Sequence, residues 1–155
     1  MNTIVTDAGE GEKLWFSGGG VHTWKVKAEE TQGGLGIFED TLERGKTTPL
    51  HVHPDSDEIV YVLEGEILIH AEGNPRTVGK GGMVFNPRGV PHAFVVTSER
   101  ARILAIVTPA ARIEAFYRGA STPGESGATD FAKVGAAAKE TGATVILGPP
   151  PFARP

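Results

Sequence analysis

The sequence predicts an all-β domain, an antiparallel sandwich or barrel that is followed by C-terminal helical segments. Between residues 20 and 108, short runs of β-branched and aromatic residues recur, each bounded by turn-forming or charged residues. After Pro109 the pattern changes to good helix formers with apolar residues at helical spacing. A chain of 155 residues can bury one core but is short for two. We therefore expect one domain over 1–155, with a barrel core over about 20–108 and an extension over about 109–155.

Each expected strand is an apolar run that ends at a turn signal. The tight connection Glu64-Gly65 separates two of these runs, and Gly73-Asn74-Pro75 is expected to form a further turn. The expected strands are residues 21–26, 35–42, 49–53, 58–63, 66–71, 83–86, 92–97 and 102–108.

The last third of the chain is expected to hold two helices and a stiff tail. Residues 110–118 combine good helix formers with an apolar stripe. Asp130 is a suitable N-cap for a second helix over 131–140. Residues 144–147 could form a further strand or an arm. The proline-rich residues 148–155 should be extended and cannot join a sheet interior.

Composition and charge exclude several classes of partner. The net charge is −4 and the lysines and arginines are scattered, so no basic surface for nucleic acid is expected. There are no cysteines, which excludes disulfides and thiolate ligands. The amino terminus lacks the features of a secretory signal, and the longest apolar stretch, 103–107, is too short to span a membrane. We expect a cytoplasmic protein.

Four candidate metal ligands lie in two motifs bounded by glycine and proline. Because strand side chains alternate between faces, His51 and His53 project from the same side, and Glu58 can return to that side after a short turn. His92 follows a later turn. Three imidazoles and one carboxylate suit one divalent ion of Fe, Ni, Mn, Co, Cu or Zn rather than Ca or Mg. Four ligands on an octahedral ion leave two positions open, which favours catalysis over a structural role.

These two motifs resemble the paired motifs of the cupin superfamily. From Gly45 to Gly65 the chain fits G(X)5HXH(X)3-4E(X)6G at every defined position. From Gly81 it fits G(X)5PXG(X)2H(X)3N except at the last position, where Val96 replaces asparagine. The resemblance implies a jelly-roll barrel in which His51, His53, Glu58 and His92 hold the metal. Only one motif pair is present, so a single barrel is implied. Such barrels commonly pair into homodimers.

The replacement of asparagine by Val96 predicts an apolar pocket wall. Phe94 and Val96 share the ligand face of the strand that begins at His92. A sugar would require hydrogen-bonding groups there, whereas an aromatic substrate would tolerate apolar ones. The alternative is that Phe94 and Val96 only fill the core.

Glu58 could have a second role besides binding the metal. Apolar surroundings would raise its proton affinity, so that it could accept the proton of a substrate hydroxyl. Two histidines, His22 and His70, lie outside the motifs. We expect each of them either at the surface or in contact with a metal ligand without binding the metal itself.

Within the superfamily, the chain is most similar to quercetinase-type dioxygenases, since Thr108-Pro109 and the aromatic pair Phe116-Tyr117 follow the barrel. The resemblance implies a metal-dependent dioxygenase that cleaves a flavonol-like or other hydroxylated aromatic substrate with O2. Two alternatives remain open. One is a cupin isomerase, epimerase or lyase that acts on a polar small molecule, and the other is a non-enzymatic cupin that binds a small ligand.

Overall fold

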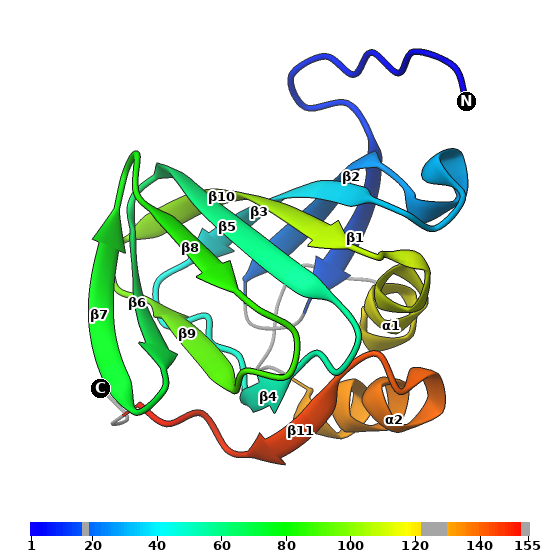
Figure 1. Cartoon of the computed structure of the whole chain (residues 1–155). Coiled ribbons are helices and arrows are strands. Elements are labelled where there is room, and N and C mark those ends of the chain that lie inside the picture. Colours follow the sequence, from blue (N-terminus) through cyan, green and yellow to red (C-terminus); the bar gives the residue numbers. More distant parts are fainter. Residues whose placement is uncertain (17–18, 122–129, 153–155) are drawn as a thin grey trace.

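The computed structural model describes residues 1–16, 19–121 and 130–152, which form a barrel of two antiparallel sheets with two helices at one end (Figure 1). The larger sheet contains, in spatial order, β1 (Glu12–Phe16), β2 (Gly20–Val26), β3 (Gly36–Glu43), β10 (Arg100–Thr108), β5 (Asp57–Glu64) and β8 (Met83–Asn86). The smaller sheet contains β11 (Val145–Gly148), β4 (Leu50–Val52), β9 (His92–Val96), β6 (Glu66–Ala71) and β7 (Asn74–Gly79). The predicted antiparallel all-β fold is confirmed.

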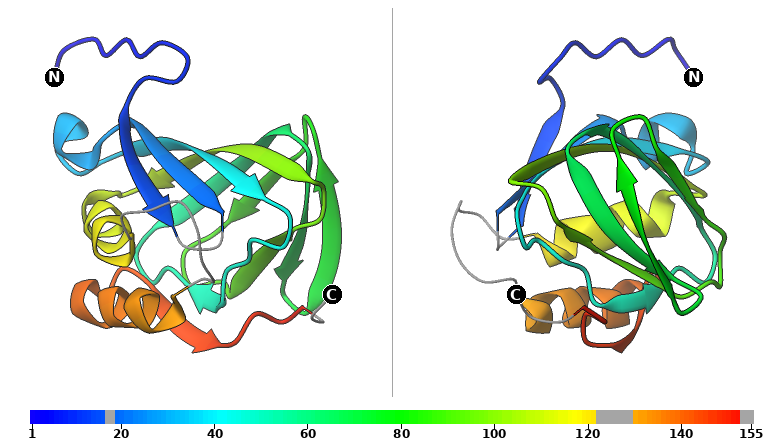
Figure 2. Two further views of the ribbon diagram at one scale, coloured as in Figure 1. Left: turned by 180° about the vertical axis from the view of Figure 1, so that it is seen from behind. Right: turned by 90° about the vertical axis from the view of Figure 1, so that its left-hand side faces the viewer.

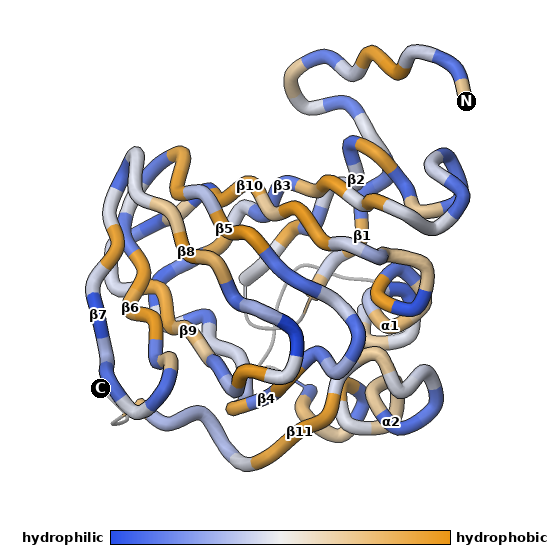
Figure 3. The backbone as a smooth tube through the Cα atoms, viewed as in Figure 1, coloured by the Kyte–Doolittle hydropathy of each residue, from blue (hydrophilic) through white to orange (hydrophobic). Residues whose placement is uncertain are grey.

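Strand alternation builds the barrel core. Every second residue of β10 is buried, and the inward residues serve two apolar clusters. Ala101 and Ile103 belong to the cluster at the end away from the helices, whereas Ala105 and Val107 belong to the cluster beneath them. Hydrophobic stretches lie along strands of both sheets, such as β5 and β6 (Figure 3). Burying one such Ile or Val side chain contributes roughly 1.5–3 kcal/mol.

Helices α1 (Ala111–Ala120) and α2 (Phe131–Thr141) lie together at one end of the barrel (Figure 2). Helix α1 buries Ile113 and Phe116 against the barrel core. Asp130 caps α2 as predicted, because its side chain accepts a hydrogen bond of 3.0 Å from the backbone N–H of Lys133. A short 3-10 turn, η1 (Ala28–Thr31), follows β2. None of the helices in the described ranges is long and apolar enough to cross a membrane.

Two strands were not predicted. Strand β1 pairs with β2 along its whole length, so the larger sheet begins before residue 20. Strand β7 contains Asn74 and Pro75, which the sequence assigned to a turn; that turn is instead made by Glu72 and Gly73, both with positive φ. Pro75 is tolerated because β7 lies at the edge of its sheet.

The C-terminal extension adds a strand to the barrel. Strand β11 pairs antiparallel with the short β4, and the smaller sheet therefore extends beyond residue 108. Of the two forms that the sequence allowed for residues 144–147, the structure shows the strand. The tail residues 149–152 then lie beside the outward side chains of β6 and β9, where Phe152 contacts His70 with 6.4 Å between ring centroids. Residues 153–155 of the predicted tail lie outside the described ranges.

Candidate metal centre

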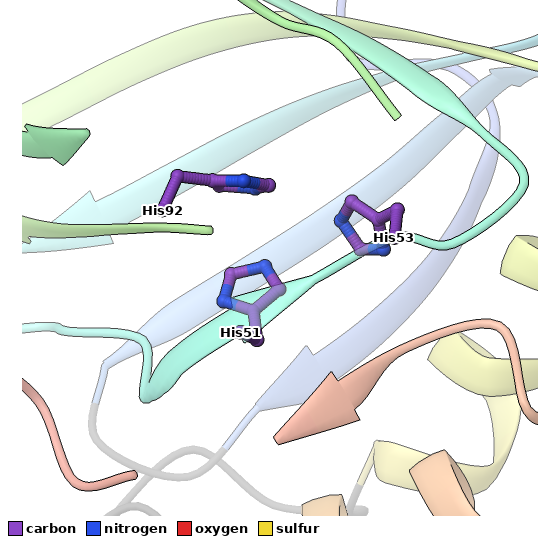
Figure 4. Close-up of side chains that lie close together, drawn as sticks. All are labelled: His51, His53 and His92. Atoms are coloured by element: carbon purple, nitrogen blue, oxygen red, sulfur yellow. The ribbon is translucent and has the colours of Figure 1, made fainter. Parts of the chain in front are cut away.

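Strands β4 and β9 bring three of the predicted ligands together. His51 lies on β4 directly opposite His92 at the start of β9, and His53 follows two residues after His51. One nitrogen from each of the three imidazoles lies within 4.8 Å of the others. All three side chains are buried, and their rings lie close together (Figure 4).

Backbone carbonyls orient all three imidazoles in the same way. Each Nδ1 lies within hydrogen-bond distance of a carbonyl oxygen, so Nδ1–H donates and Nε2 keeps its lone pair. Such outer contacts fix the tautomer and ring direction of metal-binding histidines. The three contacts are His51 to Pro49 (2.8 Å), His92 to Val90 (2.9 Å) and His53 to Ala143 (3.2 Å).

The Nε2 atoms of His53 and His92 are placed where they could bind a cation. Both atoms are buried and have no hydrogen-bond partner among the described residues. An unsatisfied buried polar atom costs about 1–3 kcal/mol, so a native structure rarely keeps one without a reason. Burial is the main cause that lowers the pKa of His51, to about 3, and the charges of His92 and His53 add to it. Burial also lowers the pKa of His53. Neutral imidazoles with inward lone pairs fit a divalent transition metal.

Glu58 lies beside this group rather than within it. Its Oε2 is 3.3 Å from His92 Nε2 and accepts a hydrogen bond of 3.1 Å from the side-chain amide of Asn86. Burial acts to raise the pKa of Glu58, but the contact with His92 and the charges of the imidazoles outweigh it and lower that pKa. Burial likewise acts to lower the pKa of His92, but the contact with Glu58 outweighs burial and raises that pKa. The predicted rise in the proton affinity of Glu58 is therefore wrong. A cation between the Glu58 carboxylate and His92 Nε2 would give both of these atoms a partner.

A pocket between the barrel and the helices opens onto two of the histidines. His51 and His53 line it together with Phe94, which lies where the sequence predicts a pocket wall. Val96 does not line this pocket among the described residues; it is 1% exposed and packs in the core cluster away from the helices. The core-filling alternative therefore describes Val96. The remaining walls come from helices α1 and α2, from strands β1, β3 and β11, and from the segment 46–49 before β4.

Several polar residues of this site were missed by the sequence analysis. Asn86 stands opposite Glu58 on the paired strand β8, and Thr144 Oγ1 lies 3.1 Å from His53 Nδ1. Asp40 and Lys46 line the pocket. The only signal for Asn86 was its position directly before Pro87 in the second motif, and nothing local connects Thr144 with a histidine 91 residues away.

The two histidines outside the motifs have different environments. His22 is fully buried, and its Nδ1 lies 2.8 Å from Asp40 Oδ1. Of the two locations that the sequence allowed for His22, the surface location is therefore wrong, because its neighbours on β2 and β3 are inward-facing aromatic side chains. His70 is half-buried on the outside of the smaller sheet, beside Phe152.

Comparison with known proteins agrees with this geometry. The cupin domain family matches residues 38–107. Quercetin 2,3-dioxygenase from Bacillus subtilis (strain 168) is 31% identical over 98 residues, which are 63% of this chain and 29% of that protein. Dimethylsulfoniopropionate lyase DddQ from Ruegeria pomeroyi is 48% identical over 60 residues, which are 38% of this chain and 29% of that protein. The chain thus spans less than a third of the length of either relative.

Solved structures share the fold. KdgF from Halomonas sp. matches with a TM-score of 0.63 at 18% identity, over 70% of this chain and 94% of that one. The span matched by the cupin domain family contains all three gathered histidines and Glu58, and the two sheets around them share the fold of the KdgF structure. On these grounds the chain contains a cupin domain over residues 38–107.

Proposed function

We propose that the protein is a metal-dependent dioxygenase that cleaves a flavonol-like or other hydroxylated aromatic compound with O2. The observation that carries the proposal is the pocket that joins two inward-facing imidazoles, His51 and His53, to an aromatic wall. The wall includes Phe94, Phe116 and Tyr117, whose flat faces suit an aromatic ring. The similarity to a quercetin dioxygenase over 63% of the chain supports the same class.

In this proposal His51, His53, His92 and Glu58 hold the metal. A bound divalent transition metal would act as a Lewis acid that favours the ionised form of a substrate hydroxyl. The protein orients the ligands, aligns the substrate and excludes water. The carbonyls behind the three imidazoles keep their Nε2 atoms pointed inward, and the aromatic wall aligns the substrate and excludes water. Glu58, held in place by the side-chain amide of Asn86, is the proposed proton acceptor. The implied homodimer and the cytoplasmic location belong to the same proposal.

Oxygen uptake tests the proposed class. The metal-loaded protein is mixed with quercetin, or with smaller hydroxylated aromatics, in an oxygen-electrode cell while loss of substrate is followed by absorbance. We expect one O2 to be consumed for each substrate molecule lost. Loss of substrate without oxygen uptake would contradict the dioxygenase, and binding without any turnover would indicate a ligand-binding cupin.

A lyase is the second candidate, and two observations favour it. The chain is 48% identical to a dimethylsulfoniopropionate lyase over 60 residues. Moreover, Asp40 and Lys46 give the pocket a charged end that a purely aromatic substrate does not require. Burial lowers the pKa of Lys46 to about 8, against the opposing charge of Asp40. Product formed from a small charged substrate in the absence of oxygen would support this candidate.

Replacing Glu58 with glutamine should separate ligation from proton transfer. The amide keeps the size of the side chain and one ligand oxygen but cannot accept a proton as a carboxylate does. We expect part of the metal to be retained while the turnover number falls by about 10²–10⁴-fold. Metal content is measured by elemental analysis and turnover by substrate loss.

The matched control is Glu64→Gln on the same strand, where the side chain is 57% exposed and lies 3.8 Å from Arg102. This variant should keep full activity. Full activity in Glu58→Gln would instead remove Glu58 from the proton-accepting role.

A further inference from the structure

Tyr117 is the one phenol that lines the pocket among the described residues. It lies on α1 and shares the pocket wall with His51 and His53. The other tyrosine of the chain, Tyr61, is on β5 and is 41% exposed. Tyrosine in an apolar wall differs from phenylalanine only by its hydroxyl, which needs a polar partner when water is excluded.

Aromatic neighbours on every side fix the ring of Tyr117. It stacks on His22 with 4.4 Å between centroids and 21° between planes. Phe38 contacts its edge at 5.0 Å, and Phe116 at 5.4 Å. His22 is itself held by Asp40 at 2.8 Å. A ring packed in this way has little rotational freedom, so its hydroxyl is presented in a defined position.

The electrostatic environment keeps the phenol protonated. Burial raises the pKa of Tyr117 well above its ordinary value, and the charges of Glu58 and Asp40 raise it further. A neutral hydroxyl in a pocket of low polarity is a strong donor toward a developing anion, because the hydrogen bond is not weakened by competing water.

We propose that Tyr117 is a catalytic residue that donates a hydrogen bond to the ionised oxygen of a hydroxylated substrate held in the pocket beside His51 and His53. This inference rests on the proposed function, because it requires that the substrate be bound through an ionisable oxygen. It also defines the substrate class more narrowly: the molecule carries a phenol or enol whose oxygen lies between the three-histidine group and helix α1.

Binding of 4-nitrocatechol to the cobalt(II)-loaded protein tests the inference without turnover. The probe is a hydroxylated aromatic whose visible absorbance changes when its oxygens ionise, so its Kd is read directly by titration. Tyr117→Phe removes one oxygen atom and keeps every ring contact. We expect its Kd to rise by about tenfold to a hundredfold, the range for a hydrogen bond to a charged group. Cobalt content and melting temperature should match those of the unaltered protein.

Tyr61→Phe is the matched control, because it removes the same atom from the exposed face of β5. Its Kd should not change. Equal binding by Tyr117→Phe and the unaltered protein would overturn the role of Tyr117 and leave the proposed function standing. No binding of the probe by the unaltered, loaded protein would overturn both.

Discussion

His51→Ala should lose stable metal binding. The substitution removes one of three imidazoles whose nitrogens lie within 4.8 Å of one another, and alanine supplies no ligand atom in its place. Loss of contacts that merely orient a ligand costs about 10–100-fold in metal affinity, so loss of the ligand itself should cost at least about a hundredfold. Equilibrium dialysis against Ni²⁺, Co²⁺ or Zn²⁺ followed by elemental analysis measures the effect.

Thermal unfolding gives a second measurement of the same loss. Metal at a hundred times its dissociation constant stabilises the native state by about 2.7 kcal/mol, so the unaltered protein should melt higher when loaded, whereas His51→Ala should not. His70→Ala is the control, because His70 lies on the outside of the smaller sheet beside Phe152. If His51→Ala bound metal as tightly as the unaltered protein, the assignment of the three-histidine group as the metal site would be wrong.

Gly65→Ala should be the most destabilising of the small changes in the first motif. Gly65 connects β5 and β6 with φ of 74°, a conformation that disfavours any side chain. A Cβ there would also lie 2.1 Å from the carbonyl oxygen of Arg100 and 2.6 Å from Ser98 Oγ. The backbone oxygen cannot move without disturbing β10. We expect a loss of about 3 kcal/mol in the free energy of unfolding, measured by urea denaturation.

Gly45→Ala separates the two causes. Gly45 also has positive φ, of 82°, but a Cβ there would meet nothing within 4 Å. The backbone strain alone should cost about 1–2 kcal/mol. Similar losses in the two variants would show that φ, and not the carbonyl of Arg100, explains why Gly65 is required.

The closeness of His51 and His53 could be predicted because it is local. His51 lies on β4 and His53 comes directly after its end, and the two-residue spacing of extended chain places both side chains on the same face. Most strands were predicted for the same reason, since period-two alternation is visible within a few residues. Strand β7 was missed because it is exposed and begins with Asn74 and Pro75, so it has neither an apolar face nor typical strand residues.

The surroundings of the ligands could not be predicted because they depend on contacts between distant segments. The partner of His53 is 90 residues away, and Asn86 reaches Glu58 only through the pairing of β5 with β8. The pKa of Glu58 was predicted in the wrong direction for a related reason. Its apolar surround was visible in the sequence, but the distance to His92, which decides the balance, was not.

The hydrogen bond between His53 and Ala143 makes the C-terminal extension part of the candidate metal site, although the extension supplies none of the candidate ligands. Ala143 follows α2 directly, and β11 then pairs with the strand that carries His51. Docking of this segment and alignment of the His53 imidazole are therefore coupled. Each stabilises the other by the same free energy. Any change that detaches this segment from the barrel would leave His53 without the carbonyl that orients it, and would weaken metal binding although all the candidate ligand residues are still present.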